Sequence, residues 1–392
     1  MELTKKQEEG LKIAVARHKS REKYTVISGY AGTGKSTLVR FIIDALDVDK
    51  DKVAYATYTG KAAEVLRKKG NPNAMTLHKL LYDSIPRQGG GFIRIPKKQL
   101  DYSIVVVDEV SMVPKTMVDM LLKHKVYVIF LGDPFQLPQI DKKETHTLLD
   151  KPHIFLDQVM RQAAESEIIQ LTMKIRNGED IPFMHGKEVI VAPKAELVTG
   201  HLTWADIIIC ATNKTRHNMN RQKRELLGYS GVLEENESLL IKCNYWEVCN
   251  ENGDALVNGS IGTIKNVFES FRRIPSYVKS DIRDMPTIVG EFISDDGVSF
   301  GNIEFDKNFL LKEEPCIDWR TSYQLGKLKN KIGDIIPKQA TYGYAITGHC
   351  SQGSQWDKVL VIEESFPFDK MEHARWLYTC CTRPTSRLVL IR

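Results

Sequence analysis

One short segment constrains this chain more than any other. Residues 27–39 read ISGYAGTGKSTLV, an apolar run that breaks into a stretch with three glycines and a lysine, followed by a serine and a threonine, before apolar residues resume. Residues 24–28 (YTVIS) favour a buried strand, and residues 36–46 (STLVRFIIDAL) have the three- and four-residue apolar spacing of a helix. A strand, GxxxxGK[ST] and a helix in this order are typical of a phosphate-binding P-loop.

The residue types of this loop predict ATP and Mg²⁺ as ligands. Glycines let backbone N–H groups close around phosphates, and the N-terminus of the following helix favours an anion. Lys35 would reach the β and γ phosphates, and Ser36 would bind magnesium. A glycine-rich turn with a solvated lysine is the alternative. The predicted nucleotide-binding residues of the loop are Gly29, Gly32, Thr33, Gly34, Lys35, Ser36 and Thr37.

A second segment supplies acidic chemistry. The sequence YSIVVVDEVSMV contains a predicted strand, 104–107, that ends at Asp108 and Glu109. We predict that Asp108 holds magnesium together with Ser36 and that Glu109 is the general base, because phosphoryl transfer depends mainly on positioning and charge stabilisation. A solvated acidic pair that caps a strand is the alternative.

Composition limits the class of protein. A chain of 392 residues is expected to form two or three compact units. We expect a soluble protein, because no apolar run approaches the length of a membrane span, and residues 1–14 (MELTKKQEEGLKIA) argue against secretion. Its seven cysteines lack regular spacing, which favours free thiols in a reducing compartment, and the adjacent Cys380 and Cys381 are predicted core residues. The net charge of +5 favours an anionic partner only weakly.

The order of the motifs resembles superfamily 1 helicases. A predicted strand, 126–131, runs into GDPFQLPQI, so a P-loop, an Asp-Glu pair and GDxxQLP follow one another. Further segments narrow the resemblance to the RecD/Dda-like branch. They are AYATYTGKAAEVL (54–66), AMTLHKLL (74–81), LDQVMRQ (156–162), ADIIICATNKTRHNMN (205–220), LVNGSIGTI (256–264), TYGYAITGHCSQGSQWDKVLV (341–361) and LYTCCTR (377–383).

The resemblance implies an α/β fold with two RecA-like P-loop NTPase domains. A β-hairpin insertion in the first would act as a pin, and a small β-barrel would interrupt the second. A charged stretch at about 269–300 matches no motif and is expected to form an arm. The expected boundaries are 1–187 for the first motor domain with its pin at about 84–99, 188–233 and 338–392 for the second motor domain, and 234–337 for the barrel.

The resemblance also assigns residues to ATP hydrolysis. Arg161 and Arg383 would be arginine fingers supplied across a cleft, because a planar, permanently charged guanidinium suits the γ phosphate. Gln136 would sense that phosphate, and Gln7, on a predicted first helix, would read adenine with an amide that both donates and accepts. The predicted catalytic residues are therefore Lys35, Asp108, Glu109, Gln136, Arg161 and Arg383.

A single DNA strand is expected to lie across both motor domains. Its bases would stack and its backbone would be held without reading sequence. Phe92, near the predicted hairpin tip, would be the wedge that splits a duplex. Cys350 stands where a lysine is common in the family, so one phosphate contact is missing. The expected contacts are Thr59, Lys61, Thr76, His78, Phe92, Asn213, Asn258, Thr347 and His349.

The sequence therefore predicts an ATP-dependent DNA helicase that moves on single-stranded DNA, 5′ to 3′ by family resemblance, and unwinds duplex with a pin. A translocase that displaces bound proteins and unwinds weakly is one alternative. A nucleotide-gated DNA-binding module without turnover is another. The expected partners are single-stranded and forked duplex DNA and proteins of replication or recombination. We expect a monomeric motor in the cytoplasm of a bacterial cell, or a phage protein in its host.

Overall fold

The computed structural model describes residues 3–86, 92–138, 142–160, 164–251, 255–295, 297–332, 335–367 and 369–392. Contacts divide the chain into two units. Unit 1 comprises Met1–Leu81, Lys97–Arg216 and Ile346–Arg392, and unit 2 comprises Tyr82–Pro96 and His217–Ala345. Each unit is described by itself.

The first sheet of unit 1 is parallel throughout. Its strands are β1 (Tyr24–Gly29), β2 (Val53–Thr57), β3 (Ala74–Thr76), β6 (Ile104–Val107), β7 (Tyr127–Gly132) and β8 (Ile154–Leu156). They lie in the order β3-β2-β6-β7-β1-β8, and each neighbouring pair is parallel. The accompanying helices are α1 (Lys5–Lys19), α2 (Lys35–Leu46), α3 (Gly60–Lys68), α4 (Leu77–Leu81) and α5 (Lys115–Leu121). The carboxyl ends of the strands therefore share one edge.

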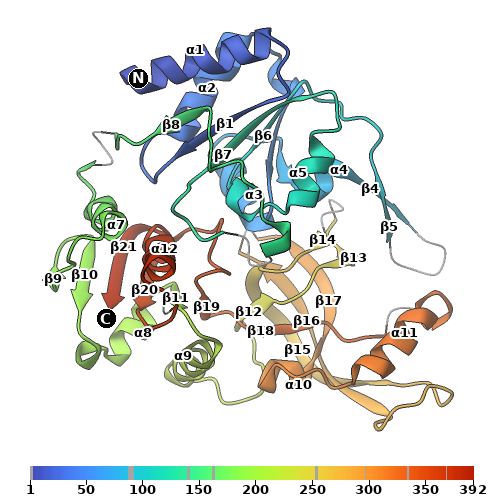
Figure 1. Cartoon of the computed structure of the whole chain (residues 1–392). Coiled ribbons are helices and arrows are strands. Elements are labelled where there is room, and N and C mark those ends of the chain that lie inside the picture. The colour runs from blue at the N-terminus through green and yellow to red at the C-terminus, as the bar shows by residue number, and fades with distance from the viewer. Residues whose placement is uncertain are drawn as a thin grey trace. The chain divides into compact units, whose positions relative to one another are not determined.

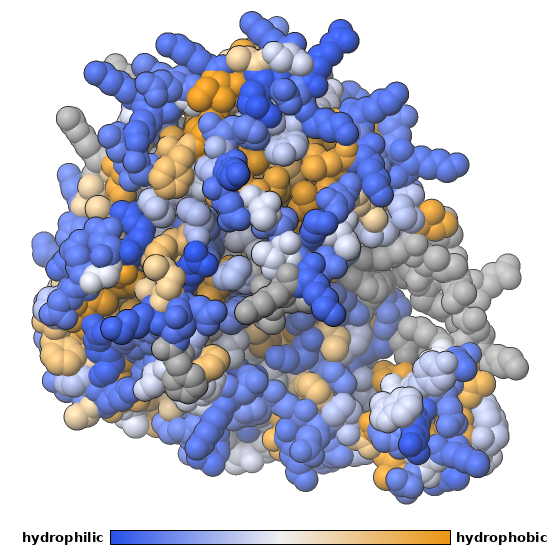
Figure 2. All heavy atoms as spheres, viewed as in Figure 1, coloured by the Kyte–Doolittle hydropathy of each residue, from blue (hydrophilic) through white to orange (hydrophobic). Residues whose placement is uncertain are grey.

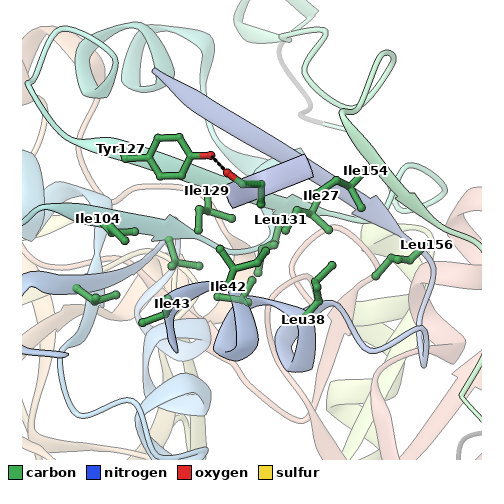
Figure 3. Packing of buried hydrophobic residues seen from close by; sticks show 14 residues of the cluster. Ile27, Leu38, Ile42, Ile43, Ile104, Tyr127, Ile129, Leu131, Ile154 and Leu156 are labelled. Atoms are coloured by element: carbon green, nitrogen blue, oxygen red, sulfur yellow. Dashed lines mark hydrogen bonds between the residues drawn. The ribbon is translucent and has the colours of Figure 1, made fainter. Parts of the chain in front are cut away.

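Helix α2 lies against this sheet through one apolar stripe. Leu38, Val39, Ile42 and Ile43 recur at three- and four-residue spacing and are buried. They pack with apolar residues of β1, β6 and β7, as Figure 3 shows for the labelled members of the core. The Tyr127 hydroxyl donates to the Ala14 carbonyl of α1 at 3.1 Å. This packing fixes the start of α2 beside the end of β1, where the P-loop lies.

A second sheet completes unit 1. Its strands are β9 (Met184–His185), β10 (Val189–Ala192), β11 (Ile207–Cys210), β19 (Ala345–Thr347), β20 (Trp356–Ile362) and β21 (Pro384–Ile391). The order is β19-β11-β20-β21-β10-β9, in which β11, β20, β21 and β10 are parallel and β9 is antiparallel to β10. Its helices are α7 (Glu167–Asn177), α8 (Thr199–Trp204) and α12 (Lys370–Cys381). Helix α9 (Asn213–Leu226) begins in unit 1 and continues into unit 2. Cys380 and Cys381 are fully buried, as predicted.

Unit 2 is built on an antiparallel sheet with its own apolar core. The sheet has the order β17-β16-β15-β12-β18. An isolated bridge joins Phe305 to Lys338, next to β18, so the two outer strands of the sheet meet there. The elements of unit 2 are β4 (Tyr82–Pro86), β5 (Phe92–Pro96), β12 (Ser238–Ile241), β13 (Tyr245–Cys249), β14 (Ala255–Leu256), β15 (Ile261–Arg273), β16 (Asp284–Ser294), β17 (Ser299–Asp306), β18 (Ala340–Tyr342), α10 (Lys307–Lys312) and α11 (Trp319–Ile332).

The charged stretch that matched no motif, about 269–300, contains the outer part of β15, the turn, the whole of β16 and the start of β17. Strands β15 and β16 pair from Gly262↔Ser294 out to Arg273↔Asp284. Beyond the sheet, the turn of this hairpin lies against α11 (Figure 1) and shares a second small core with it. The predicted pin region forms a two-stranded hairpin, β4 and β5, with Tyr82 opposite Pro96 and Pro86 opposite Phe92.

Hydrophilic residues cover most of the face drawn in Figure 2, and apolar residues lie between them. In the part of the chain that the structure describes, no helix is both long enough and apolar enough to cross a membrane.

Candidate nucleotide site

Three predicted motifs lie at the same edge of the first sheet. The P-loop follows β1, the Asp-Glu pair follows β6, and the GDPFQLP segment starts at the end of β7. Because β6, β7 and β1 are adjacent and parallel, their carboxyl ends bring these motifs together. The sheet order therefore builds a site from segments that are far apart in the sequence.

The P-loop curls around the ammonium group of its own lysine. Lys35 Nζ donates to the carbonyl oxygens of Gly29, at 2.6 Å, and Tyr30, at 3.0 Å. Gly32 and Gly34 have φ angles of 74° and 79°, a left-handed conformation that glycine adopts readily. A Cβ on Gly34 would lie 2.5 Å from Gln7 Nε2. The loop therefore requires glycine at this position.

Gln7 joins the first helix to the P-loop. Its backbone N–H and its side-chain oxygen form a capping box with Thr4, at 3.3 Å and 2.9 Å. Its Nε2 donates to the carbonyls of Thr33 and Gly34, both at 3.4 Å. Gln7 is 1% exposed, and Met160 lies against the same amide. The predicted adenine reader thus lies beside the P-loop with both ends of its amide engaged.

Asp108 and Glu109 are held in a constrained geometry. Glu109 has a φ of 54°, which is unusual for a residue with a side chain, and its backbone N–H donates to Asp108 Oδ1 at 2.8 Å. Burial raises the pKa of Asp108 to about 6, the neighbouring Glu109 charge adds to this rise, and Lys35 opposes it. A cation near Asp108 would favour its charged form.

Arg383 reaches the acidic pair from the second sheet. Its Nη1 lies 3.9 Å from Glu109 Oε1, and the residue is 3% exposed. In the amide orientation that satisfies both neighbours, Gln136 donates to Glu109 Oε2 at 2.8 Å and accepts from Arg383 Nη2 at 3.1 Å. Arg383 Nε donates to the Thr379 carbonyl at 2.9 Å, which fixes the guanidinium to the end of α12. The structure thus brings together three residues that the sequence placed in one site.

Tyr378 is a site residue that the sequence analysis missed. Its hydroxyl donates to Asp133 Oδ2 at 2.6 Å and accepts from the Ala31 N–H of the P-loop at 3.0 Å. The next residue, Thr379, accepts from the Leu137 N–H at 3.0 Å. Helix α12 is therefore tied both to the P-loop and to the GDPFQLP segment. Its position in LYTCCTR, five residues before Arg383, was the only hint in the sequence.

Replacing Tyr378 with phenylalanine is expected to destabilise the protein by about 1–3 kcal/mol, because it leaves the buried Asp133 carboxylate and Ala31 N–H short of a partner. Urea unfolding of the full chain measures this change. Tyr323→Phe is the matched control, since Tyr323 is 59% exposed. Equal unfolding free energies for the two variants would contradict the bridging role of Tyr378.

The residues present fit a magnesium nucleotide. Among the residues that the structure describes, no group of three or more His, Cys, Asp or Glu side chains could hold a metal ion. Magnesium in nucleotide sites is held mainly by phosphates and water with one or two carboxylates, so a larger acidic cluster is not needed. Asp108 supplies a buried carboxylate, and Ser36 lies exposed in the first turn of α2, after the glycine-rich loop.

Two predicted strand-binding segments lie side by side in unit 1. Thr59 begins α3 and accepts from the Ala62 N–H at 3.3 Å. A Cβ added to Gly353 would lie 3.0 Å from Thr59 Oγ1 and 3.1 Å from the Ala62 side chain. The turn that follows β19 therefore contacts the start of α3, and Gly353 permits that approach. Within this turn, burial lowers the pKa of His349, which favours its neutral form.

Each of the other residues predicted to contact DNA has its own neighbours in the structure. Lys61 forms an ion pair with Glu64 at 3.1 Å. Thr76 accepts from the Lys79 N–H at 3.2 Å, and the His78 ring lies 5.9 Å from the Tyr58 ring. Asn213 lies at the start of α9, where its side-chain oxygen accepts from Arg216 Nε. Thr347 ends β19. Asn258 lies in unit 2, and its N–H donates to Asn244 Oδ1.

Two of the predicted site residues are not described in full by the structure. Arg161 lies outside the described residues, as do residues 162 and 163. Phe92 is described only by its position at the start of β5, and its side chain is not described. Thr37 follows Ser36 in the first turn of α2 and is half-buried.

Comparisons with known proteins match both ends of unit 1. An AAA domain family matches residues 2–189, and a UvrD-like helicase C-terminal domain family matches residues 342–391. The ATP-dependent RecD2 DNA helicase of Deinococcus radiodurans is 35% identical over 159 residues, 39% of this chain and 22% of that protein. The ATP-dependent DNA helicase dda of Enterobacteria phage T4 is 27% identical over 192 residues, 45% of this chain and 43% of that protein.

The resemblance to the RecD/Dda-like branch of superfamily 1 helicases is confirmed. A Pif1 helicase from Bacteroides, solved with ADP-AlF3 and single-stranded DNA, matches all of this chain and 92% of its own with a TM-score of 0.53 and 18% identity. At this identity the match concerns the fold alone, a mixed α/β fold with parallel sheets like the two-domain RecA-like structure of Pif1. The chain spans less than half the length of the RecD2 and dda relatives.

Proposed function

We propose that this chain is an ATP-dependent DNA helicase that moves along single-stranded DNA, 5′ to 3′, and unwinds duplex. The observation that carries the proposal is the contact of Arg383 with Glu109 and Gln136. A purely nucleotide-binding fold needs no buried arginine from a second sheet beside its acidic pair. A hydrolase turns over faster with one, because a guanidinium stabilises charge as the γ phosphate is transferred.

Each residue of the site has a distinct role in this proposal. Lys35 and the P-loop N–H groups bind the phosphates, and Gln7 orients the base. Glu109 takes the proton of the attacking water, Gln136 holds that carboxylate in place, and Arg383 stabilises the developing charge. Magnesium held by Ser36 and Asp108 would supply charge neutralisation at the phosphates. Arg161 is proposed as a second finger from its motif alone.

A motor must also link this site to the strand. The proposed link in unit 1 runs from Arg383 through the Thr379 carbonyl and the Thr379 hydroxyl to Leu137. Gln352 Nε2 donates to the Leu137 carbonyl at 2.6 Å, and Gln352 lies in the turn that contacts the start of α3. Closure over nucleotide would therefore move the turn that carries His349. The proposed strand contacts are Thr59, Lys61, Thr76, His78, Asn213, Asn258, Thr347 and His349.

The finer organisation belongs to the same proposal. We infer that the β4–β5 hairpin is a pin and that the unit 2 sheet is a small barrel, supported by its meeting edges at Phe305 and Lys338. The proposed first motor domain is 1–187, and the predicted second is 188–233 with 338–392. Residues 340–342 of that second segment form β18, which pairs with β12 in the unit 2 sheet. The expected partners are single-stranded and forked DNA, with a monomeric motor in the cytoplasm of a bacterial cell or of a phage host.

A forked duplex tests the proposal. The wild-type chain with ATP is expected to separate the fork, and Phe92→Ala is expected to lose most of this activity while its strand-stimulated ATP hydrolysis is kept. The reason is that a wedge acts on the junction and not on the nucleotide. The measurement is fluorescent strand separation alongside ATP turnover on oligo-dT.

Ile95→Ala is the control, because Ile95 lies in the same hairpin strand and is 45% exposed. Equal unwinding by Phe92→Ala and Ile95→Ala would remove Phe92 from the role of wedge. A wild-type chain that hydrolyses ATP on oligo-dT yet leaves the fork intact would favour the protein-displacing translocase.

A further inference from the structure

Helix α11 carries a surface pattern that the nucleotide site does not use. Its sequence, WRTSYQLGKLKNKI, contains four basic residues and no acidic one. Trp319 is 73% exposed, the highest value among the large hydrophobic side chains of the described residues, and Tyr323 is 59% exposed. Large exposed aromatic rings are unfavourable in water unless they contact something else. The pattern therefore points to a binding partner.

One side of α11 holds the helix to its own unit. Thr321 and Leu325 are 1% and 2% exposed. Leu325 packs in the small core with Val278 of the β15–β16 turn and Met285 of β16, and Thr321 Oγ1 donates to the Lys279 carbonyl at 3.4 Å. These contacts hold one side of the helix against its own unit. The residues about half a helical turn away from Leu325 therefore lie on the opposite, outer side.

The outer side presents the aromatic rings in a row. Trp319, Tyr323 and Lys327 follow one another at four-residue spacing, so they lie along one face, roughly opposite Leu325. Gly326 falls on the same face, and a Cβ added there would meet nothing within 4 Å. The surface beside Tyr323 and Lys327 is therefore open at Gly326, where a flat ligand could approach without meeting a side chain.

A cation accompanies each ring. The Arg320 guanidinium carbon lies 5.5 Å from the Trp319 ring centroid, and Lys327 Nζ lies 4.3 Å from the Tyr323 ring centroid. The acidic residue next to this face, Asp318, accepts hydrogen bonds from the Arg320 and Thr321 N–H groups at 2.7 Å and 2.8 Å. Its carboxylate therefore caps the helix, and the outer face keeps a positive charge.

We propose that the outer face of α11, formed by Trp319, Arg320, Tyr323 and Lys327, binds single-stranded nucleic acid. Unpaired bases would stack on the two rings, and the two cations would contact the flanking phosphates. A duplex keeps its bases stacked on one another, so rings on a convex helix fit a single strand better. In Figure 2 the corresponding part of the surface, at the lower right, mixes hydrophilic and apolar residues. This site goes beyond the proposed motor track, because none of the motif residues lies on α11.

The affinity of the full chain for oligo-dT, measured by fluorescence anisotropy without nucleotide, tests this proposal. Trp319→Ala/Tyr323→Ala is expected to weaken binding about thirtyfold or more, since stacking of each of two bases contributes on the order of 1–3 kcal/mol. Phe183→Ala is the matched control, because Phe183 is an exposed aromatic residue of unit 1, at 61%. Equal affinities for the double variant, the control and the wild type would overturn the proposal.

A second measurement does not depend on truncation. Stacking of a base on an exposed indole quenches its fluorescence, so oligo-dT is expected to quench the wild-type chain more than Trp319→Phe, which keeps a ring for stacking. Equal quenching in both proteins would exclude stacking on Trp319. Persistence of the Trp319-dependent quench without strand-stimulated ATP hydrolysis would reject the motor proposal and support this site.

Discussion

Glu109→Gln is expected to lower ATP turnover by about 10²- to 10⁴-fold, because general-base catalysis contributes about that much and an amide cannot take the proton of water. The side chain keeps its shape, so Gln136 and Arg383 still have a neighbour at the distances seen for the carboxylate. Nucleotide affinity is expected to stay within about twofold of the wild type. Steady-state turnover on saturating oligo-dT, with a parallel fluorescent-nucleotide titration, measures both quantities.

Glu372→Gln is the matched control for this change. Glu372 is an exposed residue in the first turn of α12, away from the acidic pair. Its turnover should equal that of the wild type. If Glu109→Gln retained more than a tenth of the wild-type turnover, another group would have to be the base.

Arg383→Ala is expected to reduce ATP turnover by about 10³- to 10⁵-fold, the range attributed to arginine fingers in related nucleotidases. The guanidinium lies 3.9 Å from Glu109 and is almost fully buried, so no surface arginine can take its place. Nucleotide binding should change far less, because the P-loop contacts of Lys35 do not involve Arg383. Turnover and nucleotide affinity of the same preparation separate the two effects.

Truncation of a buried arginine also removes its hydrogen bonds to Thr379 and Ser354. Arg383→Lys is therefore the second variant, because lysine keeps the charge and loses the planar fork. It should fold like the wild type and still turn over ATP at least tenfold more slowly. Full activity in Arg383→Lys would mean that a positive charge is sufficient at this position and that the planar guanidinium is not required.

Local patterns in the sequence were enough to predict the core of the site. The P-loop, the strand before Asp108 and the strand before Asp133 all lie within a residue of their predicted bounds, because each combines a buried apolar run with a distinctive polar ending. The meeting of Glu109, Gln136 and Arg383 followed from family resemblance, since no spacing rule relates residues that are far apart in the sequence.

Other features depended on contacts that the sequence does not display. The Tyr378 hydroxyl joins α12 to the P-loop at Ala31 and to the segment after β7 at Asp133. These three residues are far apart in the sequence, and no local pattern around one of them indicates the other two. The charged stretch at about 269–300 was expected as an arm without a known shape. Its far end forms a core with α11, from a separate part of the chain, so its own sequence could not show what buries Val278 or Met285.

The most direct test of the whole account is the ATP turnover of the wild-type chain with increasing oligo-dT, at several salt concentrations and with oligo-U for comparison. A strand-driven motor should show turnover that rises many-fold with the strand, and an apparent strand affinity that falls as salt increases, because phosphate contacts release counterions. Oligo-U shows whether the strand must be DNA. Turnover that is the same with and without either strand would contradict a motor in which the site at Arg383 is linked to the bound strand.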